Sequence, residues 1–119
     1  MHIAKSVKVL GTKYKIRLHT SEEDYELKEC DGYCRENLHL IVVKDFRRED
    51  KNGCRNKKEA ENIVKCSVRH EIVHAFLFES GLGWDSESVE HWAVHEEMVD
   101  WIARMGPKLH KAFKKTGCV

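Results

Sequence analysis

The chain has very little proline and no long apolar segment. Pro107 is the only proline among 119 residues, and no uninterrupted apolar run is longer than the four residues of Leu40–Val43. A helix that crosses a membrane needs ~20 mostly apolar residues, so no membrane partner is expected. The first eight residues also lack the apolar core of a secretory signal. We therefore predict a cytoplasmic protein.

An excess of charge of one sign is lacking too. The sequence has 21 basic and 20 acidic residues, a formal net charge of +1 with histidine neutral. Proteins that bind nucleic acid concentrate positive charge against the phosphates, and this balance predicts no nucleic-acid partner. The length suits one modest hydrophobic core, and we predict a single domain over residues 1–119.

Paired cysteines are also missing. The five cysteines are Cys30, Cys34, Cys54, Cys66 and Cys118, an odd number with no CxxC pair. This pattern argues against a complete disulfide framework and against a zinc ribbon. Free thiols in a reducing compartment are the preferred interpretation, and a metal site formed by Cys30, Cys34 and Cys54 is the alternative.

The first half of the sequence has the pattern of strands and turns. Two short runs, 7–10 and 14–18, are separated by a turn, and the second alternates with a period of two. Leu38–Val43 is rich in β-branched residues and predicts a well-buried strand. Asp31–Gly32 indicates a turn, and the polar segment 47–58 predicts a loop.

The second half has the pattern of helices. No proline or glycine occurs in Lys58–Ser80, which predicts one long helix. Ser86 or Ser88 can cap a second helix, which is expected to end at Gly106–Pro107. A short basic helix, Lys108–Lys115, is expected to follow. Strands followed by helices predict an α+β fold, with the helices on one side of a small sheet.

The most informative segment is the HExxH motif formed by His70, Glu71 and His74 in the first predicted helix. Histidines four residues apart project from the same helix face, so both imidazoles can reach one metal ion. The glutamate that follows the first histidine can reach a metal-bound water and take its proton. A helix with two solvated or hydrogen-bonded histidines is the alternative interpretation.

Helical geometry predicts that the motif faces a cleft. At ~100° per residue, the two histidines fall outside the main apolar arc of the helix. That arc comprises Val64, Val68, Ile72, Ala75 and Phe76. One face of the helix can therefore pack on the core while the other carries the motif.

A catalytic zinc site needs a third protein ligand and an open position for water. The second predicted helix offers five candidates: His91, His95, Glu96, Glu97 and Asp100. Glu96 and Asp100 fall within an apolar stripe, where ionised carboxylates are unfavourable unless they bind a cation or are paired. We choose Glu96 as the ligand and Asp100 as the residue that orients a ligating histidine. Pairing of both carboxylates with cations such as Arg69 is the alternative.

The HExxH motif, followed by a glutamate and, four residues later, an aspartate, resembles the gluzincin group of zinc metallopeptidases. The small size is similar to the minigluzincins, and small intracellular HExxH proteins of the ImmA/IrrE type are a related comparison. The resemblance covers about Leu38–Met105. It implies a zincin-like domain, in which N-terminal strands precede an active-site helix and a second helix carries the third metal ligand.

The resemblance also implies a function. His70, His74 and Glu96 would hold one Zn²⁺ per chain, with Asp100 supporting a histidine, and Glu71 would be the general base for hydrolysis of peptide bonds. The partner would be a peptide or protein substrate, bound along a sheet edge by main-chain hydrogen bonds. We expect this edge to be the strand Leu38–Val43, and a central core strand is the equal alternative.

Two features depart from the pattern of the group. Gluzincins commonly have asparagine before the ligand glutamate, where this chain has His95. Larger members carry a C-terminal domain that stabilises the oxyanion, and His91 or His110 is the candidate substitute here. A zinc-binding but catalytically idle module that binds a partner is therefore a second hypothesis. A structural protein without metal is a third.

Overall fold

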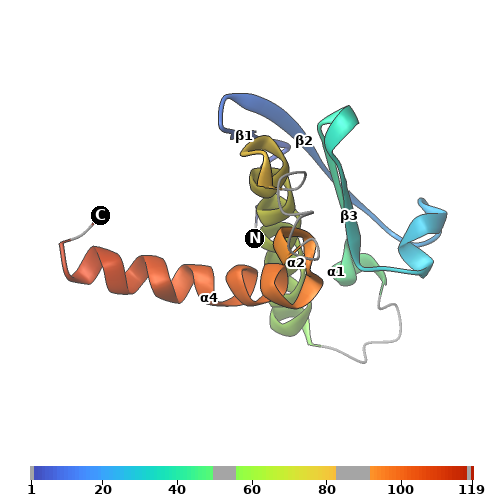
Figure 1. The fold of residues 1–119 in the computed structure, drawn as a ribbon. Coiled ribbons are helices and arrows are strands. Elements are labelled where there is room, and N and C mark those ends of the chain that lie inside the picture. The colour runs from blue at the N-terminus through green and yellow to red at the C-terminus, as the bar shows by residue number, and fades with distance from the viewer. Residues whose placement is uncertain (1, 50–55, 83–91, 118) are drawn as a thin grey trace.

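The N-terminal half of the chain forms a four-stranded mixed sheet in the computed structural model, which describes residues 2–49, 56–82, 92–117 and 119 (Figure 1). The strand order is β1-β2-β4-β3. β1 (Ser6–Val9) pairs antiparallel with β2 (Thr12–His19), and β2 pairs parallel with β4 (Leu40–Lys44). β3 (Gly32–Arg35) pairs antiparallel with β4 and forms one edge of the sheet.

The predicted strand at Leu38–Val43 is therefore an interior strand. It corresponds to β4, which lies between β2 and β3, so its placement at the sheet edge is wrong and the central-strand alternative is confirmed. Its buried residues Ile41, Val42 and Val43 are at most 1% exposed, as expected for a strand with both neighbours present. The edge strand β3 was not predicted, because Asp31–Gly32 resembles a turn.

The turns of the sheet use backbone conformations that glycine favours or tolerates. Leu10 (φ 49°) and Gly11 (φ 90°) form the two-residue connection between β1 and β2, in the positive-φ arrangement that suits a tight hairpin. Gly32 starts β3 where the strand passes close to β4. A Cβ at that position would lie 2.9 Å from the carbonyl oxygen of Val42, so only glycine fits without a shift.

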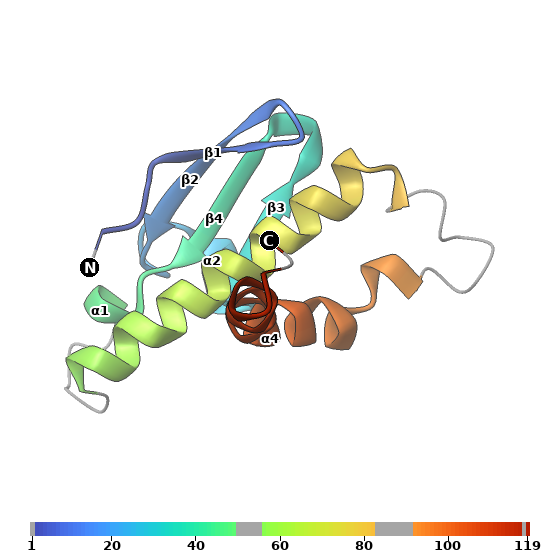
Figure 2. The ribbon, with the colours of Figure 1, turned by 90° about the vertical axis from the view of Figure 1, so that its left-hand side faces the viewer.

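The long helix α2 (Lys57–Glu79) packs against one face of the sheet (Figure 2). It begins at Asn56, whose side chain accepts a hydrogen bond from the Glu59 amide in a reciprocal capping box. These bounds agree with the predicted helix Lys58–Ser80. The hydrophobic core between sheet and helix contains Val9, Tyr14, Ile16, Ile41, Val43, Phe46, Ala60, Val64, Val68 and Ala75.

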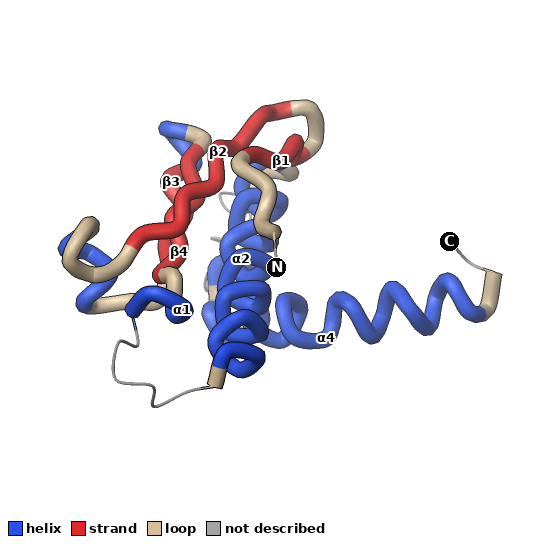
Figure 3. Tube along the Cα trace, turned by 180° about the vertical axis from the view of Figure 1, so that it is seen from behind, coloured by secondary structure: helices blue, strands red, loops and turns tan. Residues whose placement is uncertain are grey.

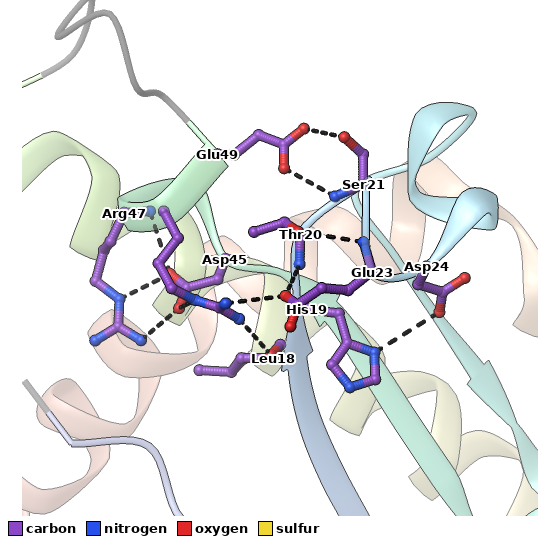
Figure 4. A network of polar contacts seen from close by, with 10 residues as sticks. Leu18, His19, Thr20, Ser21, Glu23, Asp24, Asp45, Arg47 and Glu49 are labelled. Atoms are coloured by element: carbon purple, nitrogen blue, oxygen red, sulfur yellow. Dashed lines mark hydrogen bonds and ion pairs between the residues drawn. The ribbon is translucent and has the colours of Figure 1, made fainter.

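A buried polar network joins the end of β2 to the short helix α1 (Phe46–Glu49), which occupies part of the segment expected to be a loop (Figure 4). Asp45 is only 2% exposed, and both of its oxygens accept hydrogen bonds, from the side chains of Arg47 and Arg48. Arg48 also donates to the carbonyl oxygen of Leu18 at 2.9 Å. Burial alone would raise the pKa of Asp45, but the two arginines lower it below its usual value.

The second long helix, α4 (Glu96–Lys115), contacts the side of α2 that faces away from the sheet (Figures 1 and 3). A short 3-10 turn, Trp92–Val94, precedes it. Ser86 and Ser88, the predicted caps, lie outside the described residues. The predicted break at Gly106–Pro107 is wrong, because α4 continues through both residues.

A side chain from α2 allows α4 to pass through its proline. Pro107 has no amide hydrogen and cannot donate to the carbonyl of Ala103, four residues earlier. The Nε atom of Arg69 donates to that oxygen at 2.7 Å instead. The arginine therefore satisfies the carbonyl group that proline leaves unpaired, and it fixes α4 to α2 at this point. No helix in the described parts of the chain is long and apolar enough to span a membrane.

Candidate metal centre

The two histidines of the HExxH motif lie one turn apart on α2 and point toward α4. Their ring centroids are 4.9 Å apart, and their side chains are 18% and 13% exposed. The carboxylate of Glu96, at the first turn of α4, contacts both rings. Its two oxygens lie 3.0 Å from Nε2 of His70 and 2.9 Å from Nε2 of His74. The structure thus brings together three of the predicted metal ligands from two helices.

Asp100 lies on the opposite side of the His70 ring from Glu96. One of its oxygens is 3.4 Å from Nδ1 of His70, and the other is 2.9 Å from Nε of Arg104. A carboxylate beside Nδ1 fixes the orientation of the imidazole and leaves Nε2 for a ligand. This is the position expected for the residue that orients a ligating histidine.

Glu71 is the most buried polar group of the site. It is 5% exposed and follows Ala60, Val64 and Val68 along the buried stripe of α2, at the position where an apolar residue would continue the pattern. Its Oε2 atom is buried and finds no hydrogen-bond partner among the described residues, and Oε1 is 3.9 Å from Nε2 of His70. The expectation that the whole motif faces away from the core is therefore wrong for Glu71.

Burial shifts the proton equilibria of this group of residues. Burial raises the pKa of Glu71 to about 7; His70 partly opposes this increase, and the Glu96 carboxylate adds to it. Burial also lowers the pKa of His74, although the neighbouring Glu96 carboxylate acts in the opposite direction. A neutral imidazole is the form that binds a metal, so burial favours the binding form of His74.

The residues present fit a divalent metal ion. One ligand atom from each of His70, Glu71 and His74 lies within 4.8 Å of the other two, and this is the group of described residues that could hold a metal. Two imidazole nitrogens together with carboxylate oxygens form a donor set that zinc commonly binds. The Oε2 atom of Glu71, which has no partner among the described residues, can also accept a hydrogen bond at the site. The identity of the metal is a matter for the proposal below.

The expectation that Glu96 and Asp100 lie in a buried apolar stripe is wrong. The side chain of Glu96 is 71% exposed and that of Asp100 is 41% exposed, so neither lies in a buried apolar stripe. The residues of α4 that are buried are Val99 and Ala103. Glu97 is exposed, and His95 precedes the helix without a capping hydrogen bond. His91 lies outside the described residues.

A cleft with a volume of about 890 Å³ opens beside the histidines, between β3 and the two long helices. The edge strand β3 contributes Gly32, Tyr33 and Cys34 to its wall. Tyr33 donates a hydrogen bond to Asp24 at 2.5 Å. The sequence analysis did not predict that β3 or Arg104 would line the site. The spacing of Arg104, four residues after Asp100, is the signal that could have identified it.

The described cysteines all lie along this cleft. Cys30, Cys34 and Cys66 are free thiols, in agreement with the prediction, and each contributes to the wall. Burial raises the pKa of Cys34 to about 12, with a further increase from the nearby Glu71, so its thiol stays protonated at neutral pH. Cys54 and Cys118 lie outside the described residues.

Comparisons of the chain with protein-family models, with curated proteins and with solved structures find no match. The function proposed below therefore rests on the geometry of the site.

Proposed function

We propose that this chain is a zinc-dependent metallopeptidase with a zincin-like domain, acting on a peptide or protein substrate in the cytoplasm. The observation that carries the proposal is the contact of one carboxylate, Glu96, with the Nε2 atoms of both motif histidines, next to the buried and unpartnered Oε2 of Glu71. Carboxylate and imidazole groups converge in this way where a cation binds between them.

His70, His74 and Glu96 would hold the zinc ion, and Asp100 would keep the His70 ring in its ligating orientation. A bound zinc ion supplies a water whose pKa falls toward ~7 and polarises a substrate carbonyl. Glu71 takes the proton of the attacking water on Oε2 and transfers it to the leaving amine. The low exposure of Glu71 keeps bulk water away from this transfer.

The substrate would lie along β3 instead of the strand first expected. β3 is an edge strand of the sheet and lines the cleft, so an extended peptide can add to it by main-chain hydrogen bonds. Tyr33 and Arg104 are two wall residues with donors suited to an oxyanion. His110, by contrast, is exposed on the far half of α4 and does not line the cleft.

A zinc-binding but catalytically idle module is the second candidate. It is favoured by the fact that Tyr33 and Arg104 already have partners, Asp24 and Asp100 respectively. In that case the cleft would bind a partner without cleaving it.

Zinc content and peptide cleavage together test the proposal. We expect about one zinc per chain in the parent, measured by elemental analysis, and little in His74→Ala and Glu96→Ala. Glu71→Gln is the matched control, because it keeps the shape and the predicted ligands while removing the base. Cleavage of a mixed peptide library should fall by roughly 100- to 10,000-fold in Glu71→Gln.

Each outcome separates the candidates. A zinc-loaded parent that is no more active than Glu71→Gln supports the idle module and contradicts the peptidase. Loss of zinc in His74→Ala but not in Glu96→Ala would move the third ligand to another residue. A parent that binds no zinc after incubation with the metal would contradict both functions.

A further inference from the structure

The second half of α4 projects from the body of the protein and lies against none of the other described segments (Figures 1 and 3). Arg69 on α2 donates a hydrogen bond to the carbonyl of Ala103 on α4. Among the described residues, this is the side-chain hydrogen bond between the two helices that lies farthest along α4. Beyond it, every side chain described from Pro107 to Gly117 is exposed. An isolated helix of this length is marginal in water, so the projecting half needs another surface to stabilise it.

From Trp101 onward, α4 has two chemically distinct faces. At about 100° per residue, Trp101, Met105, Leu109 and Ala112 fall within roughly 80° of one another. Of these, Trp101 is 55% exposed and Leu109 is 37% exposed, so this apolar stripe is open to solvent. Lys108, Lys111 and Lys114 fall on a separate arc of roughly 120° that begins beside the stripe.

The charge of the segment differs in sign from that of the rest of the chain. Positions 101–119 contain five basic residues and no acidic residue, which leaves 16 basic and 20 acidic residues in positions 1–100, a difference of −4. The near-zero net charge of the whole chain therefore conceals a segment of +5 joined to a body of −4.

We propose that the apolar stripe and the adjoining basic arc of α4 bind an anionic phospholipid surface, with the helix lying in the plane of the interface. A helix with tryptophan and leucine on one face and lysines on the other has the two features that this mode of binding uses. The lysines attract the anionic headgroups, and the apolar stripe enters the headgroup boundary. This departs from the sequence-based expectation of no membrane partner, and it does not depend on the proposed metal or peptidase activity.

The same features disfavour the other occupants of this surface. Two copies joined by their apolar stripes around a twofold axis would bring two basic arcs close together. A nucleic acid would satisfy the basic arc through its phosphates but would leave the apolar stripe in water.

Co-sedimentation with lipid vesicles tests the proposal. The parent should bind vesicles of phosphatidylcholine that contain a quarter of phosphatidylglycerol, and should bind pure phosphatidylcholine only weakly. Charge reversal of Lys108, Lys111 and Lys114 to Glu should weaken the partition onto anionic vesicles by roughly 100-fold or more. Leu109→Ser should weaken it by a smaller factor without changing the charge. In a variant with Trp84→Phe and Trp92→Phe, which leaves Trp101 as the remaining tryptophan, the fluorescence should shift to the blue on binding.

A matched control reverses three exposed lysines of the sheet, Lys8, Lys13 and Lys15, and so changes the net charge equally. We expect this control to bind vesicles nearly as well as the parent. If both triple variants lost vesicle binding to the same extent, the effect would come from net charge alone, and the proposal would be overturned. A parent that does not bind anionic vesicles would also overturn the proposal. So would an α4 variant that keeps vesicle binding but loses a dimer or binding to duplex DNA.

Discussion

Two buried carboxylates, Asp45 and Glu71, differ in how the fold treats them. Asp45 is 2% exposed and Glu71 is 5% exposed, so burial is nearly the same. Asp45 is surrounded by the donors of Arg47 and Arg48, and its pKa is lowered. Glu71 has a buried oxygen with no partner among the described residues, and its pKa is raised to about 7. The fold satisfies the first carboxylate and leaves one oxygen of the second without a partner among the described residues.

The comparison distinguishes a buried charge that stabilises the fold from one that serves a function. A buried polar group that is fully paired stabilises its surroundings, whereas an unpaired one reduces stability and persists where it has a use.

The largest effect is expected for Asp45. Asp45→Ala removes the acceptor for two arginines and for the Arg47 amide, which Asp45 caps at 3.2 Å. We expect the free energy of unfolding at neutral pH to fall by roughly 3–4 kcal/mol, since the variant removes the charge partner of Arg47, while Arg48 keeps its ion pair with Glu23. Because its pKa is lowered in the folded state, the contribution of Asp45 is present above pH ~4 and is lost as the pH falls. Urea denaturation at neutral and at acidic pH measures both effects. An equal loss for Lys8→Ala would contradict this assignment.

Glu71→Gln is expected to act in the opposite direction. The folded-state pKa of about 7 lies above the ordinary value of 4.5 for a glutamate, so the folded protein holds the proton more tightly than the unfolded chain. Stability contributed by this proton is complete below pH 4.5 and is lost as the pH rises through 7.

At pH ~8 the metal-free Glu71→Gln protein should therefore be more stable than the parent by roughly 2–3 kcal/mol, with no such gain near pH ~4. Thermal unfolding in the presence of a chelator, at both pH values, provides the measurement. A destabilised variant at the higher pH would show that Glu71 has a partner that stabilises its charged form.

The smallest effect on the free energy of unfolding is expected for Arg69, whose side chain on α2 is already hydrogen-bonded. Arg69→Met keeps the aliphatic stem but removes the donor to the Ala103 carbonyl, and should destabilise the protein by about 1 kcal/mol. Pro107→Ala restores an amide that can donate to the same oxygen. In that background Arg69→Met should have almost no effect, as a double-mutant cycle of unfolding free energies can determine. Additive losses would show that the arginine acts elsewhere.

The sequence predicted those parts of the fold that depend on local pattern. The uninterrupted run without proline or glycine identified α2 to within one residue at each end, and strands followed by helices predicted the α+β class. The sequence did not reveal β3, because a four-residue strand with glycine at its start has no distinctive pattern. It also did not reveal that α4 continues past Pro107, since the compensating donor, Arg69, is distant in the sequence.

The candidate site was anticipated to a different extent for each residue. The positions of His70 and His74 follow from their spacing alone. Glu96 was chosen on the assumption that it is buried, yet it lies beside the histidines with a largely exposed side chain. What places it there is the burial of Val99 and Ala103 where α4 packs on α2, which sets the rotation of α4. Rotation between two helices is a tertiary property that a single sequence pattern does not contain.

The hydrogen bond from Arg69 to Ala103 has a further consequence for how the centre is assembled. Ala103 lies seven residues after Glu96, two turns along the same rigid rod, and Arg69 is the direct neighbour of His70. The arginine therefore holds α2, which carries His70, and α4, which carries Glu96, in a fixed relative position. If a metal ion binds between these residues, the two helices are already packed together and no helix has to dock first. Capture of an ion would then be fast, with little change in heat capacity.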